Sequence, residues 1–140
     1  YDDIKLENQL CFSLYAASRE VIKLYKPCLD KFNLTYTQYV AMLVLWEEEK
    51  TTVKGMGERL HLDSGTLTPL LKKMEKSGLI SRYRDINDDR VVVVELTEEG
   101  MELKEKITCV PCEIKGKLHL SKEQAETLKK SLDNLLKVLR

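Results

Sequence analysis

Four cysteines and six tyrosines are the residues of this sequence that could do the most varied chemistry. A thiol becomes a nucleophile when its surroundings favour the thiolate, and oxidation then gives a sulfenic acid that condenses with a second thiol. A phenol can donate a hydrogen bond to such a sulfur. Cys11 and Cys28 lie near one end of the chain, and Cys109 and Cys112 lie near the other. The pattern allows packing, metal binding or thiol redox chemistry, and each site depends on its surroundings.

Cys11 lies beside a row of apolar residues that recurs every three or four positions from Leu6 to Leu24. This spacing predicts a long amphipathic helix. A cysteine beside such a stripe is most often a small buried hydrophobe. Tyr15 lies one helical turn further and would be an ordinary core contact. From the residues alone, Cys11 is therefore expected to pack.

The segment Cys109-Val110-Pro111-Cys112 has CxxC spacing, and His119 follows it. This motif can belong to a zinc site or to a thioredoxin-like redox centre. No second CxxC supplies further zinc ligands and no strand is expected before the pair, so both interpretations are weak. We expect Cys109 to lie inside a helix, and Cys112 to precede a loose segment around Gly116.

The middle of the chain alternates short helical and strand patterns. Residues 53–60 predict a helix, 61–63 a turn, and 64–77 a second helix that Gly78 ends. Residues 80–84 and 91–96 are rich in β-forming side chains and flank a polar tip, which predicts a β-hairpin. This order is that of a winged helix-turn-helix, whose second helix enters the major groove of DNA.

The second of these helices has one apolar face and one face suited to a polyanion. If Leu67 is buried, helical steps place Leu70, Leu71 and Met74 on the same side. Small and hydroxylated residues then allow close approach to DNA, and lysines can neutralise phosphates. The residues expected to contact DNA from this helix and the hairpin are Ser64, Gly65, Thr66, Thr68, Pro69, Lys72, Lys73, Lys76, Arg82, Arg84, Asp88 and Arg90. By pattern alone, an amphipathic helix with solvated lysines remains the alternative.

Two positions of this unit leave a choice open. Arg90 follows the hairpin tip and can enter a minor groove, where negative potential is enhanced. Asp88 or Asp89 can orient it through a charge-assisted hydrogen bond, although such surface pairs are often weak. Pro69 either lies inside the second helix and kinks it, or begins the helix later with Thr68 as the N-cap.

The flanking segments predict further helices. Pro27 is expected to end the first helix or to start a short second one, and Thr35 with Gln38 fits a capping box. After the hairpin, Thr97 is expected to cap another helix. A last helix follows a capping box of Ser121 with Gln124, and its leucines allow either an internal core or a dimer seam. They are Leu128, Leu132, Leu135 and Leu139.

The composition bounds the class of protein. In bulk, 23 Lys and Arg balance 23 Asp and Glu, so any basic surface must be local, and cations do gather between residues 72 and 84. No apolar run approaches about 18 residues, and no signal pattern opens the chain. We expect one cytoplasmic domain over residues 1–140, mainly α-helical with a small hairpin wing. Residues 6–50 and 98–140 would supply dimerisation helices around the winged helix-turn-helix of 53–96, and we expect no cofactor, no metal and no membrane partner.

A family resemblance joins these features. Residues 60–75, LHLDSGTLTPLLKKME, followed by GLI at 78–80, resemble the MarR family of winged-helix repressors. The block LENQLCF at 6–12, with Tyr15, Tyr25 and LTYTQY at 34–39, is similar to the branch that senses organic hydroperoxides, the OhrR-type regulators. The resemblance extends to about Pro111. It implies a homodimer on a palindromic double-stranded DNA operator, an organic hydroperoxide or related oxidant as effector, and Pro69 inside the recognition helix.

The resemblance also implies roles for the thiols and phenols. Cys11 would be the redox-sensing cysteine, Tyr25 and Tyr36 of the partner subunit would donate hydrogen bonds to its sulfur, and Tyr15 would wall the pocket. Two-cysteine members of the branch use a second cysteine of the partner chain, for which Cys112 is the first candidate and Cys109 the second. One-cysteine members use a small thiol instead. Cys28 is left as a packing residue.

Two other functions compete with a repressor that releases DNA on oxidation. A MarR-type regulator could respond to a small aromatic ligand between its helices, with Cys11 used only for packing. A thiol peroxidase or disulfide reductase could use Cys11 or the CxxC pair. No histidine lies near either thiol site in the sequence, and the recognition helix and wing would then have no purpose. We therefore expect a protein that is not an enzyme.

Overall fold

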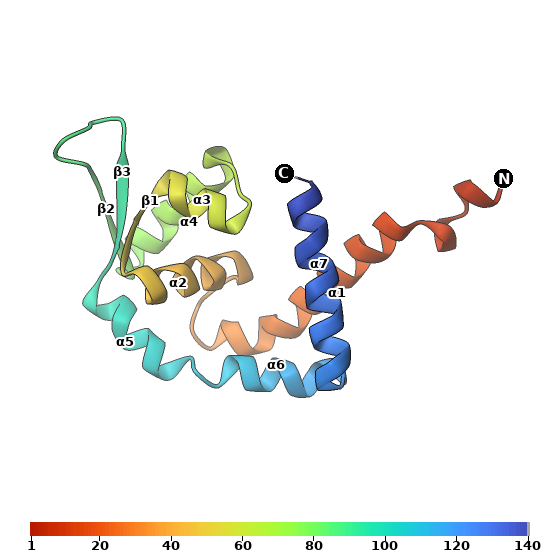
Figure 1. Ribbon diagram of the computed structural model, residues 1–140. Coiled ribbons are helices and arrows are strands. Elements are labelled where there is room, and N and C mark those ends of the chain that lie inside the picture. The colour runs from red at the N-terminus through yellow and green to blue at the C-terminus, as the bar shows by residue number, and fades with distance from the viewer. Residues whose placement is uncertain (140) are drawn as a thin grey trace.

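The computed structural model describes residues 1–139 as a helical protein with a small antiparallel sheet (Figure 1). Two 3₁₀ turns, Asp2–Ile4 and Leu6–Asn8, precede the first helix. The helices are α1 (Leu10–Asp30), α2 (Tyr36–Glu48), α3 (Val53–Leu60), α4 (Ser64–Lys76), α5 (Glu98–Lys106), α6 (Val110–Leu118) and α7 (Lys122–Val138). The strands are β1 (Lys50–Thr52), β2 (Ile80–Arg84) and β3 (Val92–Leu96). The expected fold class, mainly α with a small hairpin wing, is confirmed.

The sheet has the order β1-β3-β2, with both neighbours antiparallel to β3. The register pairs Ile80 with Leu96 and Arg84 with Val92, so β2 and β3 form the expected hairpin. Strand β1 was not expected; it pairs Lys50 with Glu95 on the other edge of β3. Three residues are too few to show a strand period, and β1 exists because β3 offers it hydrogen-bonding partners.

The core lies between α2, the apolar face of α4 and the sheet. Leu67, Leu71 and Met74 are fully buried, as their spacing predicts, and Leu70 packs at the edge of the same cluster. The indole nitrogen of Trp46 on α2 donates to the carbonyl of Gly100, 2.9 Å away on α5. This bond ties the helix after the wing to the centre of the molecule.

The helix starts follow the local signals of the sequence. Thr35 and Gln38 form the expected capping box at α2, and Ser121 and Gln124 form another at α7. The Thr97 side chain caps α5. Gly78 follows α4 with a φ of 82°, in the left-handed region that glycine adopts without strain.

Two expectations for α1 need correction. The helix begins at Leu10, not at Leu6, because residues 2–8 form 3₁₀ turns. It also continues through Pro27 to Asp30, so Pro27 neither ends it nor starts a second helix. Proline costs one backbone hydrogen bond, but the turn after it buries Cys28 and Leu29 in the core, which offsets that loss.

The junction after α5 also differs from expectation. Cys109 does not lie inside a helix; it is the N-cap of α6, and Cys112 and Gly116 lie within α6. Gly116 lies within α6, which Val110 and Ile114 anchor in the core, so the chain is not loose there. The helix ends instead at His119, whose φ of 53° turns the chain toward α7.

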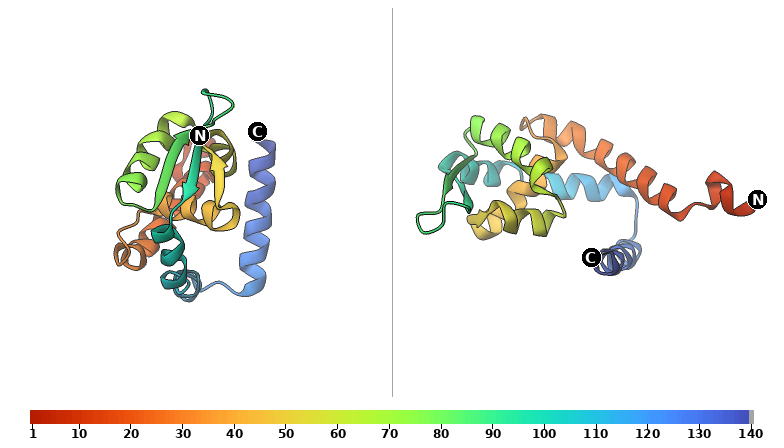
Figure 2. Two further views of the ribbon diagram at one scale, coloured as in Figure 1. Left: turned by 90° about the vertical axis from the view of Figure 1, so that its left-hand side faces the viewer. Right: turned by 90° about the horizontal axis from the view of Figure 1, so that it is seen from above.

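The ends of the chain extend away from the core. The first half of α1 projects beyond the body and α7 stands apart from it (Figures 1 and 2). Within residues 1–139, α7 has no buried residue, and Leu128 on its apolar side is 51% exposed. In the same part of the chain, no helix is long and apolar enough to cross a bilayer.

Candidate nucleic-acid interface and thiol sites

The outer face of α4 carries the residues expected to contact DNA. Asp63 starts the helix by accepting the Thr66 backbone N–H at 2.7 Å, a bond that holds the pKa of this carboxyl below its usual value. Thr68 is half-buried, and the other helix residues of the expected set are exposed. They are Ser64, Gly65, Thr66, Pro69, Lys72, Lys73 and Lys76. The structure thus gathers small, hydroxylated and basic side chains opposite the buried Leu67, Leu71 and Met74.

Pro69 lies inside α4, which runs unbroken from Ser64 to Lys76. The position of Pro69 removes the N–H that would bond to the Gly65 carbonyl four residues earlier. Gly65 is exposed, so water can satisfy that carbonyl. The choice that the sequence left open is settled in favour of an interior proline.

Asp88 positions Arg90 at the tip of the wing. The guanidinium donates to the two carboxylate oxygens of Asp88 at 3.1 and 3.2 Å, and the Arg90 backbone N–H donates to the same carboxylate at 3.0 Å. These bonds keep the pKa of Asp88 below its ordinary value. Arg90 itself stays 90% exposed. Asp89 has another role, because its carbonyl accepts the Arg84 guanidinium at 2.6 Å.

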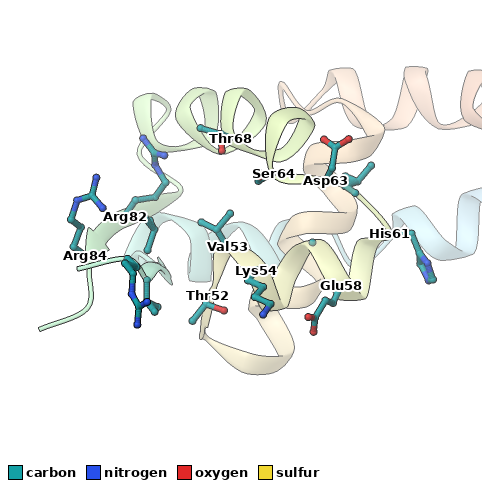
Figure 3. Close-up of a pocket in the computed structure, with 15 residues that line it drawn as sticks. Thr52, Val53, Lys54, Glu58, His61, Asp63, Ser64, Thr68, Arg82 and Arg84 are labelled. Carbon is teal, nitrogen blue, oxygen red and sulfur yellow. The ribbon is translucent and has the colours of Figure 1, made fainter. Parts of the chain in front are cut away.

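A groove of about 1070 Å³ separates the recognition helix from the wing. Ser64 and Thr68 line it from α4 and Val53 and Lys54 line it from α3, with Val53 pointing toward α4 and Arg82 and Arg84 of the wing at one end (Figure 3). Thr52, Lys54 and His61 also line this groove, but they were not among the residues expected to contact DNA. The available signal was the place of Lys54 in the first helix of a helix-turn-helix, which crosses the DNA backbone in such units.

Arg82 belongs to the groove but is also bound within the protein. Its guanidinium donates to Glu75 at 3.1 Å, and its backbone N–H donates to the other oxygen of that carboxylate at 3.2 Å. The side chain of Arg82 is only 19% exposed. Glu75 therefore joins α4 to the first strand of the wing and fixes the relative position of these two elements.

Cys11 lies in the first turn of α1 and is exposed, so the expectation that it packs in the core of its own chain is wrong. Its neighbours Phe12 and Tyr15 are exposed too, with ring centroids 6.5 Å apart. The Arg19 guanidinium lies 5.3 Å from the centre of the Tyr15 ring. This end of α1 presents a thiol among apolar side chains that no residue of the described chain covers.

Tyr25 and Tyr36 form an edge-to-face pair with ring centroids 4.8 Å apart, on one wall of a cavity of about 250 Å³ between α1 and α2. Burial, with smaller contributions from the neighbouring Tyr36, Tyr39 and Cys28, raises the pKa of Tyr25 to about 12, and burial also raises the pKa of Tyr36. Both phenols stay protonated at neutral pH and are available as donors. Along α1, however, Tyr25 is fourteen residues from Cys11, or about 21 Å at the helical rise. The two tyrosines therefore do not meet Cys11 within one chain.

The remaining cysteines lie on the α1 and α6 side of the molecule. Cys109 and Cys112 are exposed at the start of α6. Cys28 is buried, as expected of a packing residue, but it also makes a polar contact, because its thiol donates to Glu113 at 2.7 Å. That hydrogen bond first, and burial second, raise the pKa of Cys28. Eighty-five residues separate the two partners, so no sequence pattern could have paired them.

The fold and the exposed basic face together define a class, the winged-helix DNA-binding proteins. Residues 23–107 match the family model described as transcriptional regulator SarA/Rot. The chain is 57% identical over 139 residues to the organic hydroperoxide resistance transcriptional regulator of Bacillus subtilis (strain 168), covering 99% of this chain and 95% of that protein. It is 42% identical to the regulator SarZ of Staphylococcus saprophyticus, covering 96% and 92%.

Solved structures give the same result. Reduced AbfR bound to DNA matches with a TM-score of 0.81 at 36% identity, covering 99% of this chain and 96% of that one. The disulfide form of AbfR matches with a TM-score of 0.64 at 38% identity, covering 99% and 94%. AbfR is a protein of Staphylococcus epidermidis. The chain belongs to the SarA/Rot transcriptional regulators, and its resemblance to the OhrR-type branch of the MarR winged-helix repressors is confirmed.

Proposed function

We propose that this protein is a homodimeric repressor that holds a palindromic operator when reduced and releases it after an organic hydroperoxide oxidises Cys11. The observation that carries the proposal is an exposed thiol outside the winged-helix unit, in a chain 57% identical to an organic hydroperoxide resistance regulator. The sensing atom and the DNA-binding face lie on different elements, so oxidation must act on DNA through the arrangement of the subunits.

The DNA contacts follow from the geometry of the groove. Helix α4 enters the major groove with Ser64 to Lys76, and Arg90 enters the adjacent minor groove from the wing. In a dimer, two such units meet half-sites about 34–36 Å apart. Because Glu75 holds the wing against α4, each unit moves as one body, and a small rotation between subunits breaks several contacts at once.

A second subunit would cover the exposed apolar residues and would bring phenolic donors to Cys11. The apolar residues left exposed at the start of α1 and along α7 need a cover, and a second copy of the same helices provides it. We place Cys11 against Tyr25 and Tyr36 of the partner subunit, whose raised pKa values keep them protonated. Two phenolic donors would stabilise a thiolate there. Residues 6–50 and 98–140 thus serve dimerisation.

Oxidation then proceeds by ordinary thiol chemistry. The hydroperoxide converts the Cys11 thiolate to a sulfenic acid and leaves as an alcohol. Cys112 of the partner subunit attacks that sulfur, water leaves, and an intersubunit disulfide forms. Cys109 is the second candidate for this resolving role, and a small thiol is the third. The TM-score of this chain is 0.81 with reduced AbfR on DNA and 0.64 with the disulfide form of AbfR. The lower value for the disulfide form supports a change of shape on cross-linking.

The two competing functions have less support. The cavity between α1 and α2, at about 250 Å³, lies below the range of about 300–1,000 Å³ typical of ligand sites. A thiol enzyme would consume peroxide whether or not its oxidation changed DNA binding, whereas in a sensor the oxidation of Cys11 must lower the affinity for the operator. We therefore propose a non-enzymatic regulator that works in the cytoplasm. Rapid consumption of cumene hydroperoxide with a thiol reductant, together with operator binding that oxidation leaves unchanged, would contradict it.

A gel-shift titration of a palindromic operator tests the sensor. Wild type and Cys11→Ser are each compared before and after stoichiometric organic hydroperoxide. We expect the wild type to release DNA and the serine variant to keep its affinity. Cys28→Ala serves as the control, because it removes a thiol that lies outside the proposed oxidation pathway. Release of DNA by the oxidised Cys11→Ser variant would show that another group senses the oxidant.

A further inference from the structure

The CxxC motif occupies the amino end of α6. Cys109 is the N-cap, with a φ of −73° and a ψ of −21°, and Cys112 is three residues later in the first turn. Both thiols are exposed. A helix, α5, precedes this motif in place of the strand that a thioredoxin-like site requires, and a single helical turn carries both cysteines.

The geometry of that turn suits a disulfide. Residues three apart on a helix have Cβ atoms about 5–6 Å apart on the same face, and a disulfide needs them at about 3.5–4.5 Å. The Cβ atoms of Cys109 and Cys112 therefore need to approach by about 1–2 Å for a disulfide to form. Pro111 has no N–H to lose, and the turn is held by the Glu113 N–H bond to the Cys109 carbonyl at 3.1 Å.

The surroundings leave the two exposed thiols to react with each other. Glu113, the residue after Cys112, accepts a hydrogen bond from the buried Cys28 at 2.7 Å, at the contact between α6 and α1. Cys28 is not free to compete, because its raised pKa and burial keep it as a thiol bonded to Glu113.

We propose that Cys109 and Cys112 form an exchange dithiol that closes to an intrachain disulfide. The source of its oxidation rests on the function proposed above, in which Cys112 first joins Cys11 of the partner subunit. The Cys109 thiolate then attacks the Cys112 sulfur, a new S–S bond forms, and the Cys11–Cys112 bond breaks. Cys11 leaves as a thiolate, and the two oxidising equivalents of the hydroperoxide stay in α6.

This exchange gives the intersubunit cross-link a limited lifetime. Attack of Cys109 on the Cys112 sulfur is intramolecular, so it is faster than attack on the same disulfide by dilute cellular thiols. The sensing cysteine is restored before any external reductant acts. Reductants then need to reach only the exposed start of α6.

Ellman's reagent tests the dithiol without any hydroperoxide. In Cys11→Ser, the reagent attaches thionitrobenzoate to Cys112 or Cys109, and the neighbouring thiol should expel it. We expect both halves of the reagent to be released and the peptide 107–115, cut after Lys106 and Lys115, to carry an internal disulfide. Cys109→Ser in the same background should retain one thionitrobenzoate. Retention of the adduct on peptide 107–115 while both thiols are present would overturn the proposal.

A time course with organic hydroperoxide tests the exchange itself. On non-reducing gels, wild type should form a cross-linked dimer that decays to monomer, while Cys109→Ser should accumulate a dimer that persists. Equal dimer lifetimes in the two proteins would overturn the exchange. If no cross-link forms in either protein, the proposed sensing function fails, and the result with Ellman's reagent still decides whether the dithiol exists. Cys28→Ala is the control, and it should follow the wild type.

Discussion

The winged-helix unit and the thiol sites differ in how much of each one chain contains. The winged-helix unit has its own buried residues, its own capping groups and an internal clamp between Glu75 and Arg82. The thiol sites are spread over α1 and α6, and within residues 1–139 neither Tyr25 nor Tyr36 lies near Cys11. In the function proposed above, DNA contact is therefore a property of the subunit, whereas sensing is a property of the dimer. Four changes can break or sharpen this contrast.

The largest effect is expected from Leu71→Ala. Leu71 is fully buried under the recognition helix, and removing its side chain leaves a cavity that costs about 2–5 kcal/mol. Urea unfolding should show a lower midpoint with an unchanged slope. If operator affinity fell while the urea midpoint stayed unchanged, the stability of the winged-helix unit would not depend on the core under α4.

The second change acts on α7, which we propose to lie in the dimer interface. Leu128→Ala removes a half-exposed side chain of α7 that the second copy would cover, at a cost of about 2 kcal/mol per dimer. The dimer dissociation constant should rise roughly thirtyfold in sedimentation equilibrium, since about 1.4 kcal/mol corresponds to tenfold. Lys130→Ala on the same helix is the control. An unchanged dimer would remove α7 from the interface.

Arg90→Ala should weaken operator binding by roughly tenfold, because a contact of about 1–3 kcal/mol at the wing tip is lost. Fluorescence anisotropy with labelled operator measures the change, and Arg19→Ala on α1 is the matched control. In Arg90→Ala, peroxide sensitivity and the dimer dissociation constant should not change. Equal affinities for the two variants would make Arg90 a solvated charge held by Asp88.

The smallest effect concerns Tyr25. Its pKa of about 12 in the folded protein exceeds the ordinary value of 10, so folding favours the protonated phenol. The contribution of Tyr25 to the free energy of unfolding is therefore fully present below about pH 10 and is lost as the pH rises toward 12. Urea unfolding at a series of pH values should show that loss, and Tyr25→Phe should reduce it. An alkaline pH dependence identical in the variant would contradict the assignment.

The sequence predicted the features that depend on neighbouring residues. The Thr35 capping box, the end of α4 at Gly78 and the hairpin from Ile80 to Leu96 all follow from local types and short spacings, and so does the buried face of α4. The same helical period placed the expected DNA-contacting residues of α4 opposite its buried face, with Thr68 half-buried, whereas Arg82 of the hairpin is only 19% exposed and bound to Glu75. The contact of the expected residues with DNA stays a prediction.

What the sequence did not predict depends on residues far apart in the chain. Strand β1 needs β3 beside it, and Pro27 is tolerated because the next turn is buried. The bond from Cys28 to Glu113 joins α1 to α6, so composition alone assigned Cys28 only to packing. Cys11 was expected to be buried because its helix has an apolar stripe, but part of that stripe has no cover within one subunit.

The single tryptophan of the chain provides a fluorescence signal for movement of α5 relative to α2. Trp46 is buried, edge-on to Tyr39, and its indole N–H is bonded to the carbonyl of Gly100 at the start of α5. Its emission should be blue-shifted while that bond is intact, and it should shift to the red if α5 moves away from α2. Tyrosine-to-tryptophan energy transfer from the Tyr25, Tyr36 and Tyr39 cluster should change with it. Intrinsic fluorescence can therefore follow the coupling between the dimer helices and the wing in real time, with no label attached.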